Sequence, residues 1–137
     1  MRHIASVLFL AVAAALAPMA AWAQPVRGQD VTTITIQLSS FAFSPDRVRL
    51  RAGVPVRLHL VNVSDGGHNF SAPAFFAAST VTSGPVPPNG TVEVPGGGSV
   101  DIAMVPRSPG TYALRCTHFL HSFFGMTGRI VVEGPPP

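Results

Sequence analysis

The chain has 137 residues and a formal net charge of +3, with 9 basic residues, all of them Arg, against 6 acidic ones. A chain of this length forms one domain with a single packed core. Its basic balance comes from a small number of acids rather than from a dense basic segment. Arg47, Arg49, Arg51 and Arg57 do lie close together. Their period-two spacing favours one solvated strand face over a nucleic-acid site.

The N-terminus has the features of an export signal. A short polar start precedes the apolar segment 4–19, and Ala21-Trp22-Ala23 gives the small-x-small pattern of a cleavage site. We predict a secretory signal peptide over residues 1–23, cleaved after Ala23, and one domain over residues 24–137 that is periplasmic or secreted. The alternative is a retained N-terminal anchor, but the segment is short for a bilayer span, and no later segment is long and apolar enough for stable membrane insertion.

The rest of the chain predicts an all-β fold. Apolar and polar residues alternate along short segments, which is typical of strands with one buried face, and turns rich in Gly and Pro separate them. The predicted strands are 33–39, 47–51, 54–63, 91–94, 99–105, 111–116 and 128–133. Residues 72–79 are small and aromatic and predict one or two helical turns. This pattern indicates a two-sheet antiparallel β-sandwich with Greek-key connections.

The alternation also predicts which side chains meet between the sheets. The predicted core residues are Leu58, Leu60, Val100, Ile102, Tyr112, Leu114, Ile130 and Val132. Met104 has the parity of this set and is expected to pack in the core. His59 has the opposite parity and is expected at the surface.

Cys116 is the only cysteine, so the chain cannot form an internal disulfide. In an exported protein such a thiol is buried as a small apolar residue, paired with another chain, or bound to a metal. Burial is the simplest of these outcomes. The His and Met residues that follow Cys116 favour metal binding instead.

Four potential metal ligands have the spacing of a copper site. Cys116, His121 and Met126 recur at five-residue steps, and His68 lies far upstream. Two His, one Cys and one Met are the ligands of a trigonal copper site with a weak axial sulfur. The loop after Cys116 can wrap round one metal ion, with Gly125 allowing a bend before Met126. The alternative is a pair of loop histidines, a core methionine and a buried cysteine.

A wider set of motifs extends over nearly the whole predicted domain. They are Phe41-Ala42-Phe43-Ser44-Pro45, Ala52-Gly53, Asn62, His68-Asn69, Pro109-Gly110-Thr111-Tyr112 and Gly125-Met126-Thr127-Gly128-Arg129-Ile130-Val131-Val132. Together with the Cys-x4-His-x4-Met spacing, they resemble the cupredoxins, small blue copper proteins of the plastocyanin, azurin and rusticyanin kind. The resemblance implies one copper ion per chain, with His68, Cys116 and His121 as equatorial ligands. It implies Met126 as the axial ligand and Asn69 as the residue that ties the His68 loop to the cysteine loop.

His118 departs from the cupredoxin pattern, which usually has an apolar residue at this place and often has Pro-Gly just before the second His. Three interpretations stay open: a solvent-facing loop residue, a hydrogen-bonding residue near the thiolate, or a competitor for the metal. If the strand continued to residue 118, its parity would point His118 to the side of Cys116. The missing Pro-Gly also leaves the stiffness of the loop open.

An aromatic and aliphatic group surrounds His121 in the sequence. Its members are Phe119, Leu120, Phe123 and Phe124. These side chains either pack under the loop or form an exposed apolar collar. An exposed collar suits brief docking with a redox partner, and the resemblance implies the same.

We therefore expect an exported one-electron carrier with a mononuclear copper site, monomeric and without nucleic-acid partners. We do not expect an enzyme, because the ligand set leaves no open position for a substrate and the sequence offers no acid/base pair. The main alternative is a copper-handling protein that stores or delivers Cu(I). A third possibility is a metal-free sandwich that merely buries Cys116.

Overall fold

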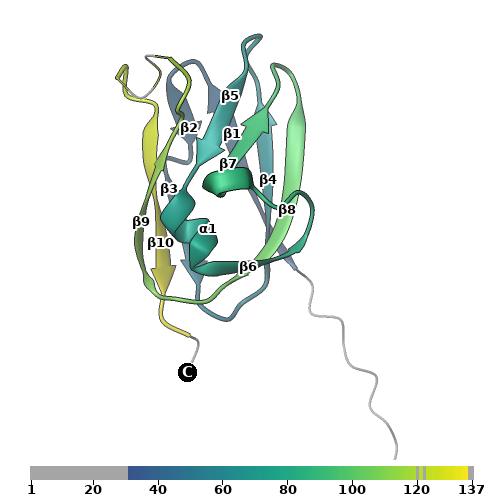
Figure 1. Cartoon of the computed structure of the whole chain (residues 1–137), viewed down its shortest axis with the longest axis vertical. Coiled ribbons are helices and arrows are strands. Elements are labelled where there is room, and N and C mark those ends of the chain that lie inside the picture. Colours follow the sequence, from purple (N-terminus) through teal and green to yellow (C-terminus); the bar gives the residue numbers. More distant parts are fainter. Residues whose placement is uncertain (1–30, 120, 122, 136–137) are drawn as a thin grey trace, which may run out of the picture.

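The computed structural model describes residues 31–119, 121 and 123–135, and the predicted signal peptide lies outside this part. Here the chain forms two five-stranded sheets (Figure 1). Sheet 1 has the order β2 (Ala42–Ser44), β1 (Thr32–Ser39), β4 (Val56–Asn62), β8 (Ser99–Pro106) and β6 (Ser79–Ser83). Sheet 2 has the order β3 (Arg47–Arg51), β10 (Thr127–Glu133), β9 (Gly110–Arg115), β5 (His68–Ser71) and β7 (Thr91–Val94). The predicted all-β sandwich is confirmed.

Most neighbouring strands are antiparallel, as predicted, but β1–β4 and β3–β10 are parallel. The first parallel pair arises because the chain leaves sheet 1 after β2, forms β3 in sheet 2 and then returns as β4. Alternation in a sequence determines which face of a strand is buried, but it carries no information on the direction of the neighbouring strand. The two parallel pairs were therefore not predictable from the pattern.

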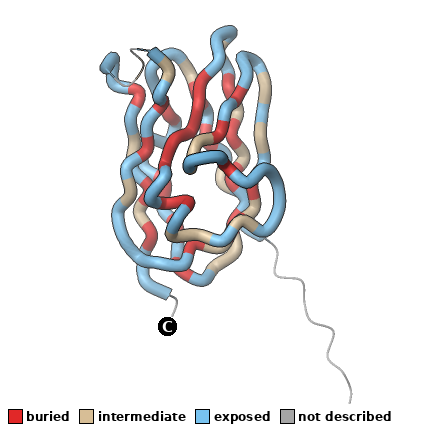
Figure 2. Tube along the Cα trace, viewed as in Figure 1, coloured by how far each residue is buried: buried red, intermediate tan, exposed pale blue. Residues whose placement is uncertain are grey.

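The core lies between the sheets, where the inward residues of each strand are buried (Figure 2). Strand β4 shows the alternation clearly, since Leu58 and Leu60 are fully buried while Arg57 is exposed. The other predicted core residues found buried are Ile102, Leu114, Ile130 and Val132, together with Met104. Val100 and Tyr112 are partly buried and pack against the core. The predicted core is thus confirmed.

Three short strands were missed by the sequence analysis. One is β2 (Ala42–Ser44), which with three residues is too short to show a period. Strand β5 (His68–Ser71) is buried along its whole length, and β6 (Ser79–Ser83) is mostly exposed, so neither shows an alternating pattern. The predicted helical turns are present as α1 (Pro73–Ala77), which buries Phe75 and Phe76. A 3-10 turn, η1 (Pro88–Gly90), packs on α1. Gly90 permits this contact, because a Cβ there would collide with the Cα of Pro73.

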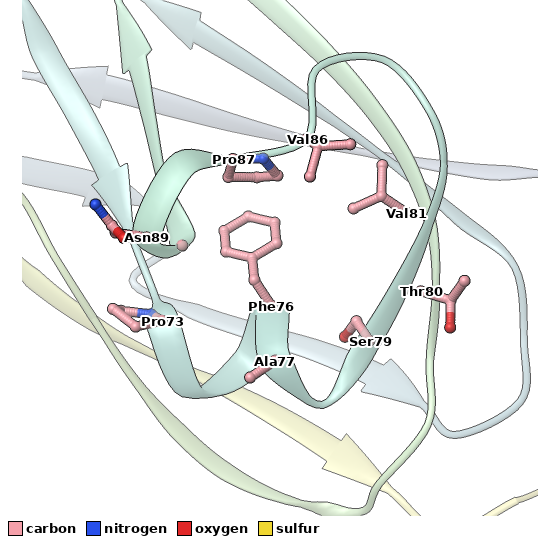
Figure 3. Close-up of a pocket in the computed structure, with 10 residues that line it drawn as sticks. Pro73, Phe76, Ala77, Ser79, Thr80, Val81, Val86, Pro87 and Asn89 are labelled. Atoms are coloured by element: carbon pink, nitrogen blue, oxygen red, sulfur yellow. The ribbon is translucent and has the colours of Figure 1, made fainter.

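A cavity of about 750 Å³ opens between α1, β6 and the segment before β7 (Figure 3). The ring of Phe76 lies in its middle, close to Pro87 and Val86. Its lining contains no His, Cys or charged side chain, so it offers no soft metal ligand and no catalytic acid or base. In the part of the chain that the structure describes, no helix is long and apolar enough to cross a membrane.

Leu60 tests the packing between the sheets. Leu60→Ala should lower the free energy of unfolding by roughly 2–5 kcal/mol, because it leaves a cavity in a closely packed interior. Val86→Ala is the control, since Val86 is 77% exposed and should change stability by less than about 0.5 kcal/mol. Urea unfolding of the apoprotein measures both values, and equal effects would contradict the described core.

Candidate metal centre

Three of the predicted ligands meet at the end of the sandwich that lies at the top of Figure 1. His68 is the first residue of β5, Cys116 follows the last residue of β9, and His121 lies in the loop between β9 and β10. The Nδ1 atoms of His68 and His121 are 3.0 Å apart. The Sγ atom of Cys116 is 3.9 Å from Nδ1 of His68 and 3.3 Å from Nδ1 of His121. Segments distant in the sequence thus bring two nitrogens and one sulfur together.

These distances fit one metal ion. Imidazole nitrogen and thiolate sulfur bind a first-row metal at about 2.0–2.3 Å, so three such donors around one ion lie roughly 3–4 Å from one another. The donor atoms of His68, Cys116 and His121 all lie within 4.8 Å of one another. One soft thiolate with two imidazoles is a donor set that suits copper.

The surroundings of the site favour the metal-binding form of His68. His68 and Cys116 are buried, and His121 is half-buried. Burial, followed by the positive charges of His121 and His118, lowers the pKa of His68 below its ordinary value. Since a neutral imidazole is the form that binds a metal, this environment disfavours the proton that would compete with one.

Met126 lies beside the cysteine through backbone contacts. The N–H of Cys116 donates to the carbonyl of Met126 at 3.1 Å, and the N–H of Met126 donates to the carbonyl of His121 at 2.9 Å. The side chain of Met126 is fully buried. Gly125 has a φ of +94°, a left-handed conformation that allows the bend expected before Met126. The loop therefore closes on itself next to the donor cluster.

Asn69 joins the histidine strand to the cysteine loop, as the sequence resemblance implied. Its Oδ1 accepts the N–H of Thr117 and its Nδ2 donates to the Thr117 hydroxyl, both at 2.8 Å. The backbone N–H of Asn69 points at Sγ of Cys116 at 3.5 Å. Because Asn69 follows His68 directly, these contacts determine where His68 and Cys116 lie relative to each other.

His118 makes its main contact with a carboxylate that the sequence analysis did not single out. Its Nε2 lies 2.8 Å from Oε2 of Glu93, whose Oε1 accepts a hydrogen bond from Nδ2 of Asn69 at 2.8 Å. Strand β9 ends at Arg115, so the strand parity considered for His118 does not apply. Its ring centroid is 5.5 Å from that of His121. Of the three interpretations, these contacts support a hydrogen-bonded residue connected to the thiolate through Glu93 and Asn69.

Glu93 is held in its charged form by these contacts. Partial burial alone would raise the pKa of its carboxyl group. The hydrogen bonds from Asn69 and His118, with the charge of His118, outweigh burial and lower the pKa below its ordinary value. Glu93 thereby connects β7 with both β5 and the cysteine loop.

Asn62 holds the loop that leads to His68. Its Nδ2 donates to the carbonyl groups of Gly66 and Val94 at 2.8 and 2.9 Å. Its Oδ1 accepts hydrogen bonds from the N–H and the hydroxyl of Ser64. A buried amide with all of these partners explains why the loop before β5 has a defined conformation.

Several aromatic side chains near His121 are exposed. Phe119, Phe123 and Phe124 are 87%, 81% and 57% exposed, whereas Leu120 lies outside the described residues. The sequence analysis did not assign Phe41 to this group. Phe41 is 42% exposed and has its ring centroid 5.4 Å from that of His121. Phe41 also packs on Phe124, so it connects the β1–β2 turn with the ligand loop. Of the two alternatives left open by the sequence, the exposed arrangement is found for Phe119, Phe123 and Phe124. We call Phe41, Phe119, Phe123 and Phe124 the aromatic collar.

The fold and the donor set define a small metal-binding β-sandwich protein. The chain belongs to the family of cupredoxin-like domains, whose model matches residues 6–132. Family membership and the cluster of His68, Cys116 and His121 together indicate a single copper site. No curated protein sequence matches the chain.

Solved structures with a similar fold include two auracyanins. Auracyanin B is 23% identical over 74% of this chain and 88% of its own, with a TM-score of 0.58. The dithionite-reduced auracyanin from the photosynthetic bacterium Roseiflexus castenholzii is 22% identical over 74% of this chain and 97% of its own, with a TM-score of 0.58. The multicopper oxidase McoA from Aquifex aeolicus is 18% identical over 80% of this chain but only 31% of its own, with a TM-score of 0.60. At these identities the likeness concerns the fold alone.

Removing the side-chain amide of Asn69 should remove the hydrogen bonds that connect β5 with the cysteine loop. We expect Asn69→Ala to lower the stability of the apoprotein by about 1–3 kcal/mol, because the N–H of Thr117 loses its partner. Gln37→Ala removes an exposed amide from β1 and should have little effect. Urea unfolding compares the two variants, and a neutral Asn69→Ala would contradict the role given to this residue.

Glu93 should make stability depend on acidic pH. A carboxyl group whose pKa is lowered in the folded state stabilises the protein at pH values above its ordinary pKa, which is 4.5 for Glu93. This contribution to stability is lost as the pH falls through the lower, folded-state pKa. The apoprotein should therefore lose more stability on acidification than Glu93→Gln does. Urea unfolding between about pH 3 and pH 7 measures the difference, and parallel curves would contradict it.

Proposed function

We propose that this protein is an exported type 1 copper protein that carries single electrons between redox partners. The observation that carries the proposal is the convergence of one thiolate and two imidazole donors in a cupredoxin-like domain. Bound copper supplies the chemistry, by alternating between Cu(I) and Cu(II). The ligands we propose are His68, Cys116, His121 and, in the axial position, Met126.

The protein's own contribution is to hold the donors still. Cys116 and His68 are buried, and the contacts of Asn69 and Asn62 keep their segments in place. A rigid set of donors needs little rearrangement when an electron arrives or leaves, which favours fast transfer. Burial also keeps water away from Cys116. The half-buried ring of His121 is the ligand nearest to solvent, and we propose that electrons pass between the copper ion and a partner through it.

Met126 is the proposed axial ligand for two reasons. Its backbone is hydrogen-bonded to that of Cys116, and its side chain is completely buried in a segment that follows His121. A thioether is a soft and weak donor, which adjusts the reduction potential without imposing a square geometry.

The aromatic collar is the proposed docking surface for redox partners. It places the exposed ring of Phe41 next to His121, and the exposed ring of Phe124 next to Phe41. A small exposed apolar surface favours weak and brief association, which electron carriers require. We propose that the protein works as a monomer and docks through this surface.

We propose a carrier rather than an enzyme because the donor cluster is one thiolate with two imidazoles, in which His68 and Cys116 are buried and only His121 is half-buried. Export through the signal peptide at residues 1–23 remains part of the proposal. In an oxidising compartment, metal binding would also protect Cys116 from pairing with other thiols.

One observation favours a second candidate function, the storage or delivery of copper. His118 is an additional imidazole at the rim of the site, and its ring centroid lies 5.5 Å from that of His121. An imidazole at this position offers an arriving or departing ion a further ligand, which a pure electron carrier does not need.

Titration of the purified apoprotein with Cu(II) tests both functions. A carrier should give an intense blue or green thiolate charge-transfer band and reversible voltammetry, and Cys116→Ala should abolish the colour. Colourless reduction to tightly held Cu(I), followed by release to a chelator, would support copper handling instead. The absence of copper binding would overturn both proposals.

Substitution of Met126 tests the axial assignment. Met126→Leu should keep the colour and raise the reduction potential, because a weak donor to the oxidised ion is lost. Met104→Leu is the matched control, since Met104 is equally buried but lies in the core on β8. Cyclic voltammetry of both copper-loaded variants gives the comparison, and an unchanged potential in Met126→Leu would refute this ligand.

A further inference from the structure

Five exposed arginines share the outer face of sheet 2. They are Arg47, Arg49 and Arg51 on β3, Arg115 on β9 and Arg129 on β10. Arg47 lies directly opposite Arg129 in the parallel β3–β10 pair. Arg115 lies opposite Thr127. Thr127 is two residues before Arg129 on β10, so Arg115, Thr127 and Arg129 all point to the same side of the sheet. We call these five residues the arginine face. The fourth member of the sequence cluster, Arg57, lies in sheet 1.

The arginine face is poorly neutralised by the chain itself. Glu133 contacts Arg49 at 3.4 Å through one carboxylate oxygen and Arg51 at 3.6 Å through the other. Among the described residues, no carboxylate lies within ion-pair distance of the three remaining arginines of the face. Their positive charge is thus available to a group outside the chain.

The position of Arg47 opposite Arg129 is unfavourable for the isolated sheet. Like charges directly opposite each other on neighbouring strands destabilise the pairing. Val48 and Ile130, the next residues on each strand, are buried, so the alternation forces both guanidinium groups onto the solvent side. An external anion would relieve the repulsion.

A cavity of about 310 Å³ lies at this pair of arginines. Its lining consists of Asp46, Arg47, Thr127, Gly128 and Arg129. Glu133 shows, on the same face, that two neighbouring arginines can share one carboxylate. Asp46 reduces the net positive charge of the cavity, which favours a singly charged carboxylate over a more highly charged phosphate.

We propose that the arginine face binds an acidic surface of a partner protein, with one partner carboxylate received between Arg47 and Arg129. Arg115 directly precedes Cys116, so the arginine face includes the residue next to a proposed copper ligand. That this partner exchanges electrons rests on the proposed function, whereas the binding itself rests on the charges of the face. Arginine suits this role because its planar group pairs with carboxylates through two parallel hydrogen bonds.

The composition of the face disfavours the other anionic partners. The residues between the arginines are small or polar, namely Thr111, Ala113, Thr127 and Val131. A membrane-surface site usually adds large apolar side chains that insert among the lipids, and a single-stranded nucleic-acid site adds aromatic rings on which bases stack. Among the described residues between these arginines, neither kind of side chain is present.

The test is binding of fluorescein-labelled poly-L-glutamate to the purified full-length mature protein, followed by fluorescence anisotropy at low ionic strength. The double variant Arg47→Gln/Arg129→Gln should raise the dissociation constant by roughly tenfold, because two charge-assisted contacts are lost. Salt should weaken binding to the unchanged protein, since exposed charges are screened.

The control variant is Arg57→Gln/Arg107→Gln, which removes the same charge from exposed positions away from the arginine face. Its dissociation constant should change by less than about twofold. If both double variants weakened the binding of poly-L-glutamate equally, the proposal would be overturned, because the net charge of the protein alone would explain the binding. Tighter binding to phosphatidylglycerol vesicles than to poly-L-glutamate, lost in Arg47→Gln/Arg129→Gln, would also overturn it in favour of a lipid surface.

The assay is independent of the copper proposal. It is run on the metal-free protein and on Cys116→Ala, and both should bind poly-L-glutamate as the unchanged protein does. A protein that failed to bind copper would leave this result intact, and a failure of poly-L-glutamate binding would leave the copper centre intact. Urea unfolding of each double variant confirms that the fold is preserved.

Discussion

The arrangement of the metal centre depends on the hydrogen bonds between Asn69 and Thr117. They fasten β5, which contributes His68, to the segment that contributes Cys116, and these two segments are far apart in the sequence. Nothing covalent joins them, and the ladder between β5 and β9 is short, with Ser71 opposite Arg115. The side-chain amide of Asn69 therefore joins the two segments by hydrogen bonds at the end of the sheet, where backbone pairing between β5 and β9 is short. The backbone N–H of the same residue faces the sulfur, so one asparagine both positions the thiolate and contacts it.

Much of this arrangement could be predicted from the sequence, because the relevant signals are local or chemically specific. Alternation in β4 and β8 indicated the buried faces, and Leu58, Leu60 and Ile102 are indeed buried. The five-residue steps after Cys116 indicated a loop that returns to one point, and His121 lies there. The donor set was recognisable because thiolate, imidazole and thioether rarely occur together by chance in a chain with a single cysteine.

The features that escaped prediction depend on contacts between distant segments. Strand β5 is buried on both faces and is only four residues long, so periodicity could not mark it. Phe41 reaches His121 from the β1–β2 turn, and Glu93 reaches His118 from β7. The arginine face was visible in part on β3, but only strand register brings Arg115 and Arg129 beside it. A sequence read without register cannot assemble a surface from three strands.

The place of β10 in sheet 2 has a consequence for synthesis. This strand follows all the others in chain order, yet it lies between β3 and β9, so it joins an edge strand to the rest of its sheet. Until β10 has left the ribosome, β3 and β9 cannot be joined in one sheet. The loop that carries His121 is then fixed only at its β9 end. In a nascent chain of this topology β3 lacks its partner strand, and the segments that carry the donor cluster are complete only when the last strand of the sheet has been synthesised.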